Sequence, residues 1–584
     1  MKYPITPTAK PSSGHIHNTL SRVASCTRGF WRDENGNLII FGVYIWVLIF
    51  MVTGIGIDLM RVERDRTALQ YTLDRAVLAA ADLDQQLNPQ VVVEDYFAKA
   101  GMSDYLASIT VDEGLGYRIV SAEAEAEVET QFMHMNGVET LSAPATGTAE
   151  ESVGGVEVSL VLDVSGSMNW NNRLYNLKIA AKNFIDEMNQ NSEDGKLSIS
   201  IVPYATQVSV PDGIFDRLNT TNEHSYSNCI NFDNWYFAKT EIWNGQPLKR
   251  TMHFDPWDDR DGRDNDPKEL VRYPVCDDSA SREILPLQKN PTTLKNFIDA
   301  LWAEGNTSLD LGMKWGTWLL DPTAQHVVDA LIADGTVHAD FSERPHGYND
   351  GETLKVIVLM SDGQNTSQYY LNDGYREGPS NIWWNDAEEK YSVYVGLDTD
   401  DDDNDGIYDE PMFYWPHEDD WVDHAYGEGT FEETVTETYC KSYKKNGSCK
   451  KYKKRKTTVT VDEPGSAEEL SYGDLYAFTT LEWIVEDLYE PWMNDSQAWD
   501  DWYYDVRNYV GSSTKDNRTS DICDAAKNAN IIVFTIGFEA PSHGDNVLED
   551  CASSPAHFFD VQGLQIDEAF SSIASSIRKL RLTQ

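Results

Sequence analysis

Five residues in three separate polar stretches of this chain have the side chains that bind a hard cation. Asp163, Ser165 and Ser167 stand at i, i+2 and i+4 of one short stretch, Thr307 lies in a second, and Asp362 precedes a glycine in a third. Carboxylate and hydroxyl oxygens are the ligands that Mg²⁺ prefers. Because the first stretch holds only one carboxylate, a cation there needs more oxygens, and we expect the other two stretches to supply them.

Each of these stretches adjoins an element that can position it. The apolar runs Val156–Leu162 and Val356–Met360 predict buried strands that end next to Asp163 and Asp362. Thr307 lies in a polar loop before an apolar helix. Ligands of open α/β sheets gather at the carboxyl ends of the strands, which is where these side chains are expected. The alternative is a set of polar loops whose Ser and Asp side chains cap helices.

Strands and helices alternate along the second half of the chain. Further strands are predicted at Leu197–Val202, Ile531–Phe538 and His557–Val561. Amphipathic spacing predicts helices at Asn172–Met188, Thr292–Trp302, Leu309–Leu320, Ile522–Asn528 and Leu564–Leu580. This alternation is typical of an α/β fold with a doubly wound, mostly parallel sheet.

The predicted α/β domain covers residues 151–584 and contains two long insertions. The stretches at about 211–290 and 366–520 are polar and acidic and rich in aromatic residues, and they interrupt the alternation. Packing in a core is the commoner explanation for such aromatic residues, with sugar stacking as the alternative.

A membrane span precedes this domain. Leu38–Ile57 holds no charged residue over 20 positions, which is enough to cross a bilayer. The apolar run is too long for a signal peptide, and no small-residue cleavage site follows it. We therefore expect residues 1–37 to form a cytoplasmic tail and 38–60 the transmembrane anchor. Arginines flank the span on both sides and leave its orientation open, but a long domain after one anchor is compatible with export.

Residues 61–150 are expected to form a helical stalk followed by a small α+β module. The stalk continues the membrane helix, because apolar residues recur at helical spacing from Leu69 to Ala80. Within the module, Glu123–Glu129 alternates Glu with apolar residues, which predicts a half-exposed strand. Glu and Ala are poor strand formers, so a helix is the alternative.

Charge and cysteine content narrow the class of protein. The formal net charge is −49, which disfavours nucleic-acid binding. Six cysteines follow the membrane span, an even number, and no Cys-x-x-Cys zinc motif occurs. The economical pairing in an oxidising compartment is Cys229 with Cys276, Cys440 with Cys449, and Cys523 with Cys551, with buried free thiols as the alternative.

A second candidate metal site is an acidic run in the second insertion. Asp401, Asp403, Asp405, Ile407 and Asp409 stand at positions 1, 3, 5, 7 and 9 around a glycine, which resembles a Ca²⁺ loop of the EF-hand or thrombospondin-repeat kind. The pattern departs from such loops at position 12, which is a methionine. The alternative is a solvated acidic loop.

One basic stretch, Lys441–Lys456, interrupts this acidic chain. It suits a hairpin arm that docks on an acidic protein or on anionic lipid. A solvated loop is the commoner explanation for such a run.

The order Asp-x-Ser-x-Ser, loop Thr and strand-end Asp-Gly resembles the metal-ion-dependent adhesion site (MIDAS) of von Willebrand factor A domains. The resemblance implies that Ser165, Ser167 and Thr307 are direct ligands of Mg²⁺ or Mn²⁺, and that Asp163 and Asp362 hold it directly or through water. It also implies an open coordination position that a Glu or Asp of a protein partner fills.

The layout of tail, single anchor, stalk and A-type domain resembles the TadG-like proteins of tight-adherence (Flp) pilus assembly. Cys523, the run Thr535–Phe538, Cys551 and a basic closing helix add to the resemblance. It implies a single-pass bacterial inner-membrane protein with its C-terminal domain in the periplasm. The expected partner is a pilus subunit or another assembly protein.

The alternative functions are a surface adhesin and a metal-dependent hydrolase. A surface adhesin would use the same site but requires the domain to be exposed outside the envelope. A metal-dependent hydrolase lacks support, because the stretches hold no general base beyond the metal-binding carboxylates and no nucleophile elbow or phosphate loop occurs in the sequence. The sequence therefore predicts a binding protein and not an enzyme.

Overall fold

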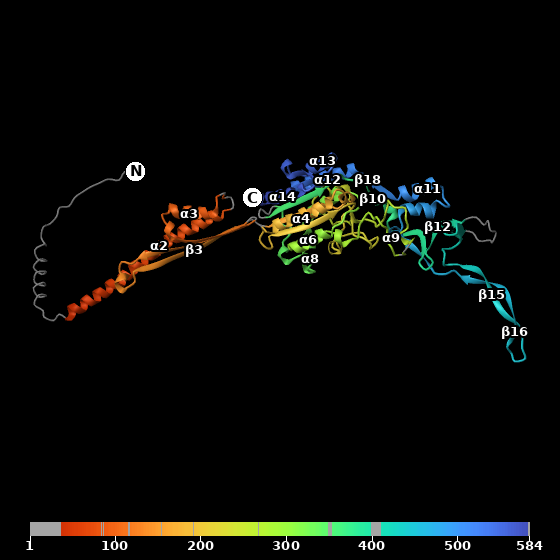
Figure 1. Ribbon diagram of the computed structural model, residues 1–584, viewed down its shortest axis with the longest axis horizontal. Helices are drawn as coiled ribbons and strands as arrows, with labels where there is room; N and C mark the ends of the chain where they lie inside the picture. Colours follow the sequence, from red (N-terminus) through yellow and green to blue (C-terminus); the bar gives the residue numbers. More distant parts are fainter. Residues whose placement is uncertain are drawn as a thin grey trace, which may run out of the picture. The chain divides into compact units, whose positions relative to one another are not determined.

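The computed structural model describes residues 37–581 apart from 83–84, 86, 115–116, 153–154, 191, 265, 267, 349–352 and 399–409. The chain divides into two compact units (Figure 1). The first unit comprises residues 1–113 and 118–151, and the second comprises 114–117 and 152–584.

The first unit combines two helices with a three-stranded sheet. The helices are α2 (Asn37–Ala81) and α3 (Pro89–Lys99), and the strands β1 (Leu106–Gly114), β2 (Tyr117–Glu129) and β3 (Thr140–Ser152) lie in that order across the sheet. Leu69, Leu73 and Val77 of α2 share one core with Phe97 of α3 and Val120 of β2. The stalk predicted after the membrane span is thus the C-terminal half of α2, and it forms one side of this core.

Strand β2 confirms the strand prediction for Glu123–Glu129 over the helical alternative. Its alanines at 122, 124 and 126 are buried, while the glutamates between them are exposed. Because successive side chains of a strand point to opposite faces of the sheet, the small apolar residues of β2 all face the core. Their burial there outweighs their weak preference for strands.

Among the described residues, α2 is the one helix that is long and apolar enough to cross a membrane, and its apolar stretch is the N-terminal part. Its large apolar side chains from Leu38 to Val52 are exposed. Just beyond this stretch, the buried carboxylate of Asp58 accepts hydrogen bonds from the backbone N–H groups of Gln131, Phe132 and Met133 at 2.8–3.0 Å. These three bonds fix the end of the apolar stretch to the loop between β2 and β3.

The second unit is built on a six-stranded sheet in the order β20-β19-β9-β4-β5-β8. Its strands are β4 (Val156–Asp163), β5 (Leu197–Tyr204), β8 (Leu285–Gln288), β9 (Leu354–Ser361), β19 (Ile532–Phe538) and β20 (Phe558–Val561). All neighbouring pairs are parallel except β5 with the edge strand β8. The mostly parallel α/β sheet is therefore confirmed, although β8 comes from residues that were expected to belong to the first insertion.

Helices cover both faces of this sheet. On one face, α4 (Arg173–Gln190), α6 (Pro291–Ala300) and α14 (Gln565–Arg581) pack against Val158 and Leu160 of β4. On the other face, α7 (Leu309–Trp318), α8 (Gln325–Ala333), α12 (Ser512–Asn528) and α13 (Ser542–Cys551) share a core with Val161 and Ile357. Central strands buried on both faces are apolar throughout, which explains why β4 and β9 are continuous Val/Leu/Ile runs.

Some of the residues between these core elements form a second layer of structure with a core of its own, while others after β5, such as Ile214, Ile230 and Phe237, join the core of the six-stranded sheet. Met252 and Phe254, which follow β5, pack in the second layer with Ile382, Tyr414 and Leu475, which follow β9. Its five-stranded sheet has the order β14-β13-β12-β11-β17, with β11 (Pro379–Asn385), β12 (Lys390–Asp398), β13 (Glu410–Trp415), β14 (Asp420–Val422) and β17 (Ala467–Ser471). Further short helices and strands after β5 and β9 are α5 (Asp212–Phe215), β6 (Ile230–Asn231), β7 (Lys249–Arg250), β10 (Gln368–Leu371), α9 (Tyr472–Phe478), α10 (Leu481–Trp483), α11 (Asp495–Trp499) and β18 (Arg507–Val510).

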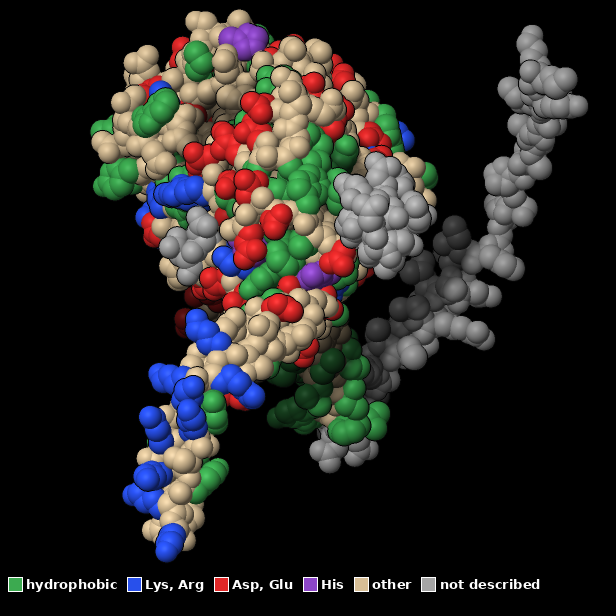
Figure 2. Space-filling view, turned by 90° about the vertical axis from the view of Figure 1, so that its right-hand side faces the viewer, with side chains coloured by type: hydrophobic (Ala, Val, Ile, Leu, Met, Phe, Trp, Pro, Cys, Tyr) green, Lys and Arg blue, Asp and Glu red, His purple; other side chains and the backbone are tan. Residues whose placement is uncertain are grey.

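A two-stranded hairpin projects from this layer. It consists of β15 (Thr430–Tyr443) and β16 (Cys449–Asp462), which pair only with each other (Figure 1). Figure 2 shows Lys and Arg side chains gathered along it. The basic stretch Lys441–Lys456 therefore lies on a hairpin and not in an irregular loop.

The three expected disulfides are all present. They join Cys229 to Cys276, Cys440 to Cys449 and Cys523 to Cys551. The bond between Cys440 and Cys449 closes the hairpin near its turn.

The buried Lys314 of α7 ties the sheet core to the residues after β5. Its Nζ donates hydrogen bonds to the carbonyl oxygens of Tyr236, Lys239 and Glu241 at 2.6–2.8 Å. Burial lowers the pKa of this amine to about 7, since the charged form loses its hydration there.

Replacing Lys314 with Met should change how stability depends on pH. In the unfolded chain this lysine keeps its proton to about pH 10.4, whereas in the folded chain it releases it near pH 7, so the unfolded state binds more protons between these values. We expect the parent's free energy of unfolding to rise relative to that of Lys314→Met by about 1.4 kcal/mol per pH unit above pH 7. Denaturant titrations of the detergent-solubilised chain from pH 6.5 to 9 measure this, and parallel curves would contradict it.

Candidate metal centre

Asp163 is the last residue of β4 and is fully buried. Its Oδ1 accepts a hydrogen bond from the backbone N–H of Ser165 at 2.8 Å, and its Oδ2 accepts one from the hydroxyl of Ser361 at 2.6 Å. Ser361 ends β9, the strand parallel to β4. The carboxylate is therefore held between the ends of two neighbouring strands.

A chain of hydrogen bonds joins the two serines to Asp362. The hydroxyls of Ser165 and Ser167 are 3.1 Å apart, and the hydroxyl of Ser167 donates to Oδ1 of Asp362 at 2.8 Å. Asp163, Ser165, Ser167 and Asp362, which are predicted from sequence as one site, thus lie together at the carboxyl ends of β4 and β9.

Thr307 lies in a loop that touches the same stretch through the backbone. The N–H of Gly166 donates to the carbonyl of Gly305 at 2.9 Å, and Gly305 has the positive φ of 85° that glycine adopts readily. Thr307 is itself buried, and its carbonyl accepts a bond from Nζ of Lys515 at 2.8 Å. Among the described residues, no hydrogen bond joins the Thr307 hydroxyl to the other four predicted site residues.

Burial disfavours the ionised form of both aspartates. It raises the pKa of Asp163 to about 7, and the nearby charge of Asp362 adds to this effect. Burial also raises the pKa of Asp362, against the hydrogen bond from Ser167 and the charge of Arg173. Two carboxylates close together in a site removed from water are stabilised by a cation.

Arg173 and Glu539 complete the cluster, and sequence reasoning missed both. Nη1 of Arg173 lies 2.6 Å from Oδ2 of Asp362, and its Nε lies 3.1 Å from Oε2 of Glu539. Arg173 begins α4 and Glu539 follows β19, so no local motif joins them to the predicted residues.

The donor set suits a hard cation. The carboxylates of Asp163 and Asp362 and the hydroxyls of Ser165 and Ser167 are oxygen donors, which suit a hard cation better than a metal that prefers nitrogen or sulfur. Within the part of the chain that the structure describes, no group of three or more His, Cys, Asp or Glu side chains could hold a metal ion. The predicted Ca²⁺ loop, Asp401, Asp403, Asp405, Ile407 and Asp409, lies outside the described residues.

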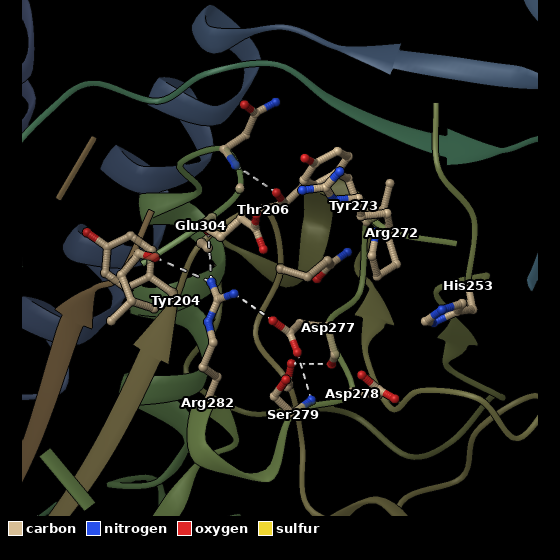
Figure 3. A pocket seen from close by; sticks show the side chains of 18 of the residues that line it. Tyr204, Thr206, His253, Arg272, Tyr273, Asp277, Asp278, Ser279, Arg282 and Glu304 are labelled. Carbon is tan, nitrogen blue, oxygen red and sulfur yellow. Dashed lines mark hydrogen bonds and ion pairs between the residues drawn. The ribbon is translucent and has the colours of Figure 1, made fainter. Parts of the chain in front are cut away.

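A cavity of about 480 Å³ adjoins these loops (Figure 3). Val164, Gly305 and Asn306 line it, and each is a sequence neighbour of, or lies close to, a predicted site residue. At its centre, the guanidinium of Arg282 pairs with Asp277 at 2.6 Å and lies 4.4 Å from the ring centroid of Trp302. The cavity therefore lies beside the candidate site.

Comparison with known structures found pilus proteins among the similar chains. The von Willebrand factor domain of the type V pili tip protein Mfa5 from Porphyromonas gingivalis is 14% identical, with 73% of this chain and 96% of that chain covered and a TM-score of 0.28. The pilus adhesin SpaC from Lactobacillus rhamnosus GG is 12% identical, with 81% of this chain and 33% of that chain covered and a TM-score of 0.27. TM-scores this low do not establish a shared fold.

A mussel protein also matches at this level. The proximal thread matrix protein 1 of the mussel byssus, with a zinc-occupied MIDAS motif, is 10% identical over 74% of this chain and 46% of that chain, with a TM-score of 0.24. This chain thus spans about a third of SpaC and about half of the mussel protein.

Sequence comparison identifies the N-terminal part of the chain. No curated protein matches the sequence. Residues 36–83 match the model of a family described as putative Flp pilus-assembly TadE/G-like. These residues include all of α2, both its apolar stretch and the stalk, so the predicted resemblance to TadG-like proteins is confirmed: the chain carries a TadE/G-like Flp pilus-assembly segment at residues 36–83.

Proposed function

We propose that this chain is a membrane-anchored component of Flp pilus assembly whose second unit is a von Willebrand factor A domain that binds a partner protein through a divalent cation. The observation that carries the proposal is the hydrogen-bonded cluster of Asp163, Ser165, Ser167 and Asp362 at the carboxyl ends of two adjacent parallel strands. The TadE/G-like segment supports the assignment to pilus assembly.

In this proposal, the hydroxyls of Ser165, Ser167 and Thr307 hold Mg²⁺ or Mn²⁺ directly, and Asp163 and Asp362 hold it directly or through water. The cation would supply an open coordination position for a Glu or Asp carboxylate of the partner. The chain's own residues prepare the site: Ser361 orients Asp163, and Arg173 orients Asp362. The Ca²⁺ ion at residues 401–410 stays a prediction from the sequence.

The proposed topology places residues 1–37 in the cytoplasm, 38–60 in the inner membrane and the remainder in the periplasm. Three disulfides support export of the second unit, because such bonds persist in oxidising compartments. The domain from 151 to 584, with its two insertions, would then meet pilus subunits or assembly proteins outside the inner membrane.

Calorimetric titration of the detergent-solubilised full chain with Mg²⁺ and Mn²⁺ tests the metal centre. The parent should bind one ion, and Asp163→Ala, Ser165→Ala should abolish binding because it removes a carboxylate and a hydroxyl from the cluster. Ser159→Ala is a matched control, since this buried serine lies on the same strand and its hydroxyl has no hydrogen-bond partner among the described residues. A folded parent that binds neither ion would remove the metal from the mechanism.

Arg173 and Glu539 should affect cation affinity in opposite directions. Arg173→Gln removes a positive charge beside Asp362, so we expect Mg²⁺ to bind roughly tenfold more tightly. Glu539→Gln removes a negative charge from the same cluster and should weaken binding. The same calorimetry at low salt measures both, and weaker binding by both variants would mean that Arg173 acts mainly by holding Asp362 in place.

A further inference from the structure

The hairpin of β15 and β16, here called the arm, carries most of its positive charge at the end away from the rest of the unit. Its strands of 14 residues each pair only with each other. The four acidic residues of the arm all lie in its proximal half, residues 430–437 and 455–462. The distal half, residues 438–454, here called the tip, holds no acidic residue and seven lysines, all of them exposed: Lys441, Lys444, Lys445, Lys450, Lys451, Lys453 and Lys454.

The lysines of the tip have no counter-charges within the described part of the chain. Among the basic residues of the arm, Arg455 alone forms an ion pair there, with Glu437 at 3.0 Å. Figure 2 shows Lys and Arg side chains standing out around the arm. Like charges this close together repel each other, and contact with an anionic surface relieves the repulsion.

Lysines and tyrosines occur on both faces of the tip. Tyr439 and Lys453 oppose each other on one face, whereas Tyr452, across from Cys440, lies on the other face together with Lys454. Two further lysines stand in the turn between the strands. The tyrosines of the tip are 43%, 68% and 67% exposed at positions 439, 443 and 452. A folded protein that packs on one face would leave the other face unused, whereas the headgroup layer of a bilayer surrounds an inserted tip.

The kind of basic residue also favours lipid over an acidic protein. All the basic residues of the tip are lysines, although arginine is enriched and lysine depleted in protein interfaces. A guanidinium forms two directed hydrogen bonds with one carboxylate, whereas the lysine ammonium is a point charge that suits diffuse attraction to many phosphates. Clusters of about four to eight basic residues are typical of segments that bind anionic lipid. Tyrosine favours the boundary between lipid and water, because its ring is apolar and its hydroxyl polar.

We propose that the tip of the arm binds end-on to the surface of a bilayer that contains anionic lipid. The lysines then lie among the lipid phosphates, and the three tyrosines lie at the level of the headgroups. The acidic residues of the proximal half stay outside the lipid in this arrangement. Glu437, the one nearest the tip, is already paired with Arg455.

The length of the arm separates the tip from the acidic remainder of the unit. Eight residues of each strand, or roughly 26 Å at about 3.3 Å per residue, lie between the base of the arm and the tip. This distance is about three times the Debye length of about 8 Å at physiological ionic strength. The arm therefore lets a chain whose formal net charge is −49 touch an anionic surface without strong repulsion.

Flotation with lipid vesicles tests the proposal. The full chain is placed in nanodiscs of phosphatidylcholine, so that neutral lipid surrounds its apolar helix, and vesicles that contain phosphatidylglycerol are added at low salt. The parent should float with these vesicles and not with vesicles of phosphatidylcholine alone. Added salt should weaken the binding, because it screens the charges of the lysines and the lipid.

Two sets of substitutions at the same positions separate charge from side-chain identity. The first combines Lys450→Gln, Lys451→Gln, Lys453→Gln and Lys454→Gln. Because each lysine near an anionic surface strengthens binding about fivefold, this variant should bind at least on the order of a hundredfold more weakly. The matched set, Lys450→Arg, Lys451→Arg, Lys453→Arg and Lys454→Arg, keeps every charge and should bind within roughly twofold of the parent.

A fluorescent label locates the contact. The label is attached in a Cys26→Ser background, because the six other cysteines form the three disulfides. Asn446→Cys places an environment-sensitive dye in the turn of the tip, and its emission should shift to the blue when anionic vesicles are added. Thr434→Cys in the proximal half is the matched control and should not shift.

The proposal fails if the parent binds neutral and anionic vesicles equally or binds neither, if the glutamine variant binds as strongly as the parent, or if the label shifts at position 434 and not at 446. Loss of binding by the arginine variant, with the circular dichroism of the parent, would indicate a partner that recognises lysine side chains in particular and would overturn the proposal too. Chelation of divalent cations should leave vesicle binding unchanged, so the result is independent of the metal centre.

Discussion

The burial of Asp163 and Asp362 side by side is the constraint on which the candidate metal centre of the second unit depends. Strands β4 and β9 are parallel and in register up to Leu162 and Met360, so the polar residues that follow them must emerge at the same place. Two carboxylates in one buried spot are unfavourable without compensation. The serine hydroxyls and the guanidinium of Arg173 are the means of compensation that this chain offers, and the proposed cation would add to them.

Local sequence motifs made most residues of the candidate site predictable. The apolar runs before Asp163 and Asp362 mark central strands, and such strands end at a common edge of the sheet. The order of the three stretches then indicated which residues share that edge. Arg173 and Glu539 were not predictable in the same way, because a helix start and a strand-end loop carry no spacing that joins them to Asp362. Their contact depends on how α4 packs and on where β19 ends.

The layer beyond the sheet was the least predictable part. Composition indicated two insertions, at about 211–290 and 366–520, but not that they share a core. Met252 and Phe254 meet Ile382 and Leu475 only because the loops after β5 and β9 leave the sheet near each other. Strand β8 was missed for a related reason: four residues at a sheet edge are too few to show a period, and their antiparallel direction breaks the expected alternation.

The bonds between Asp58 and the loop at residues 131–133 have a consequence for the anchor. A membrane helix attached by a flexible linker adjusts its depth and tilt to the thickness of the bilayer. Here the same helix continues into the core of the first unit and is held by three backbone groups where the apolar stretch ends. Sliding or rotating the helix by even one residue would break these bonds. The folded unit therefore sets how far the helix emerges, and a thicker or thinner bilayer has to adapt to the protein.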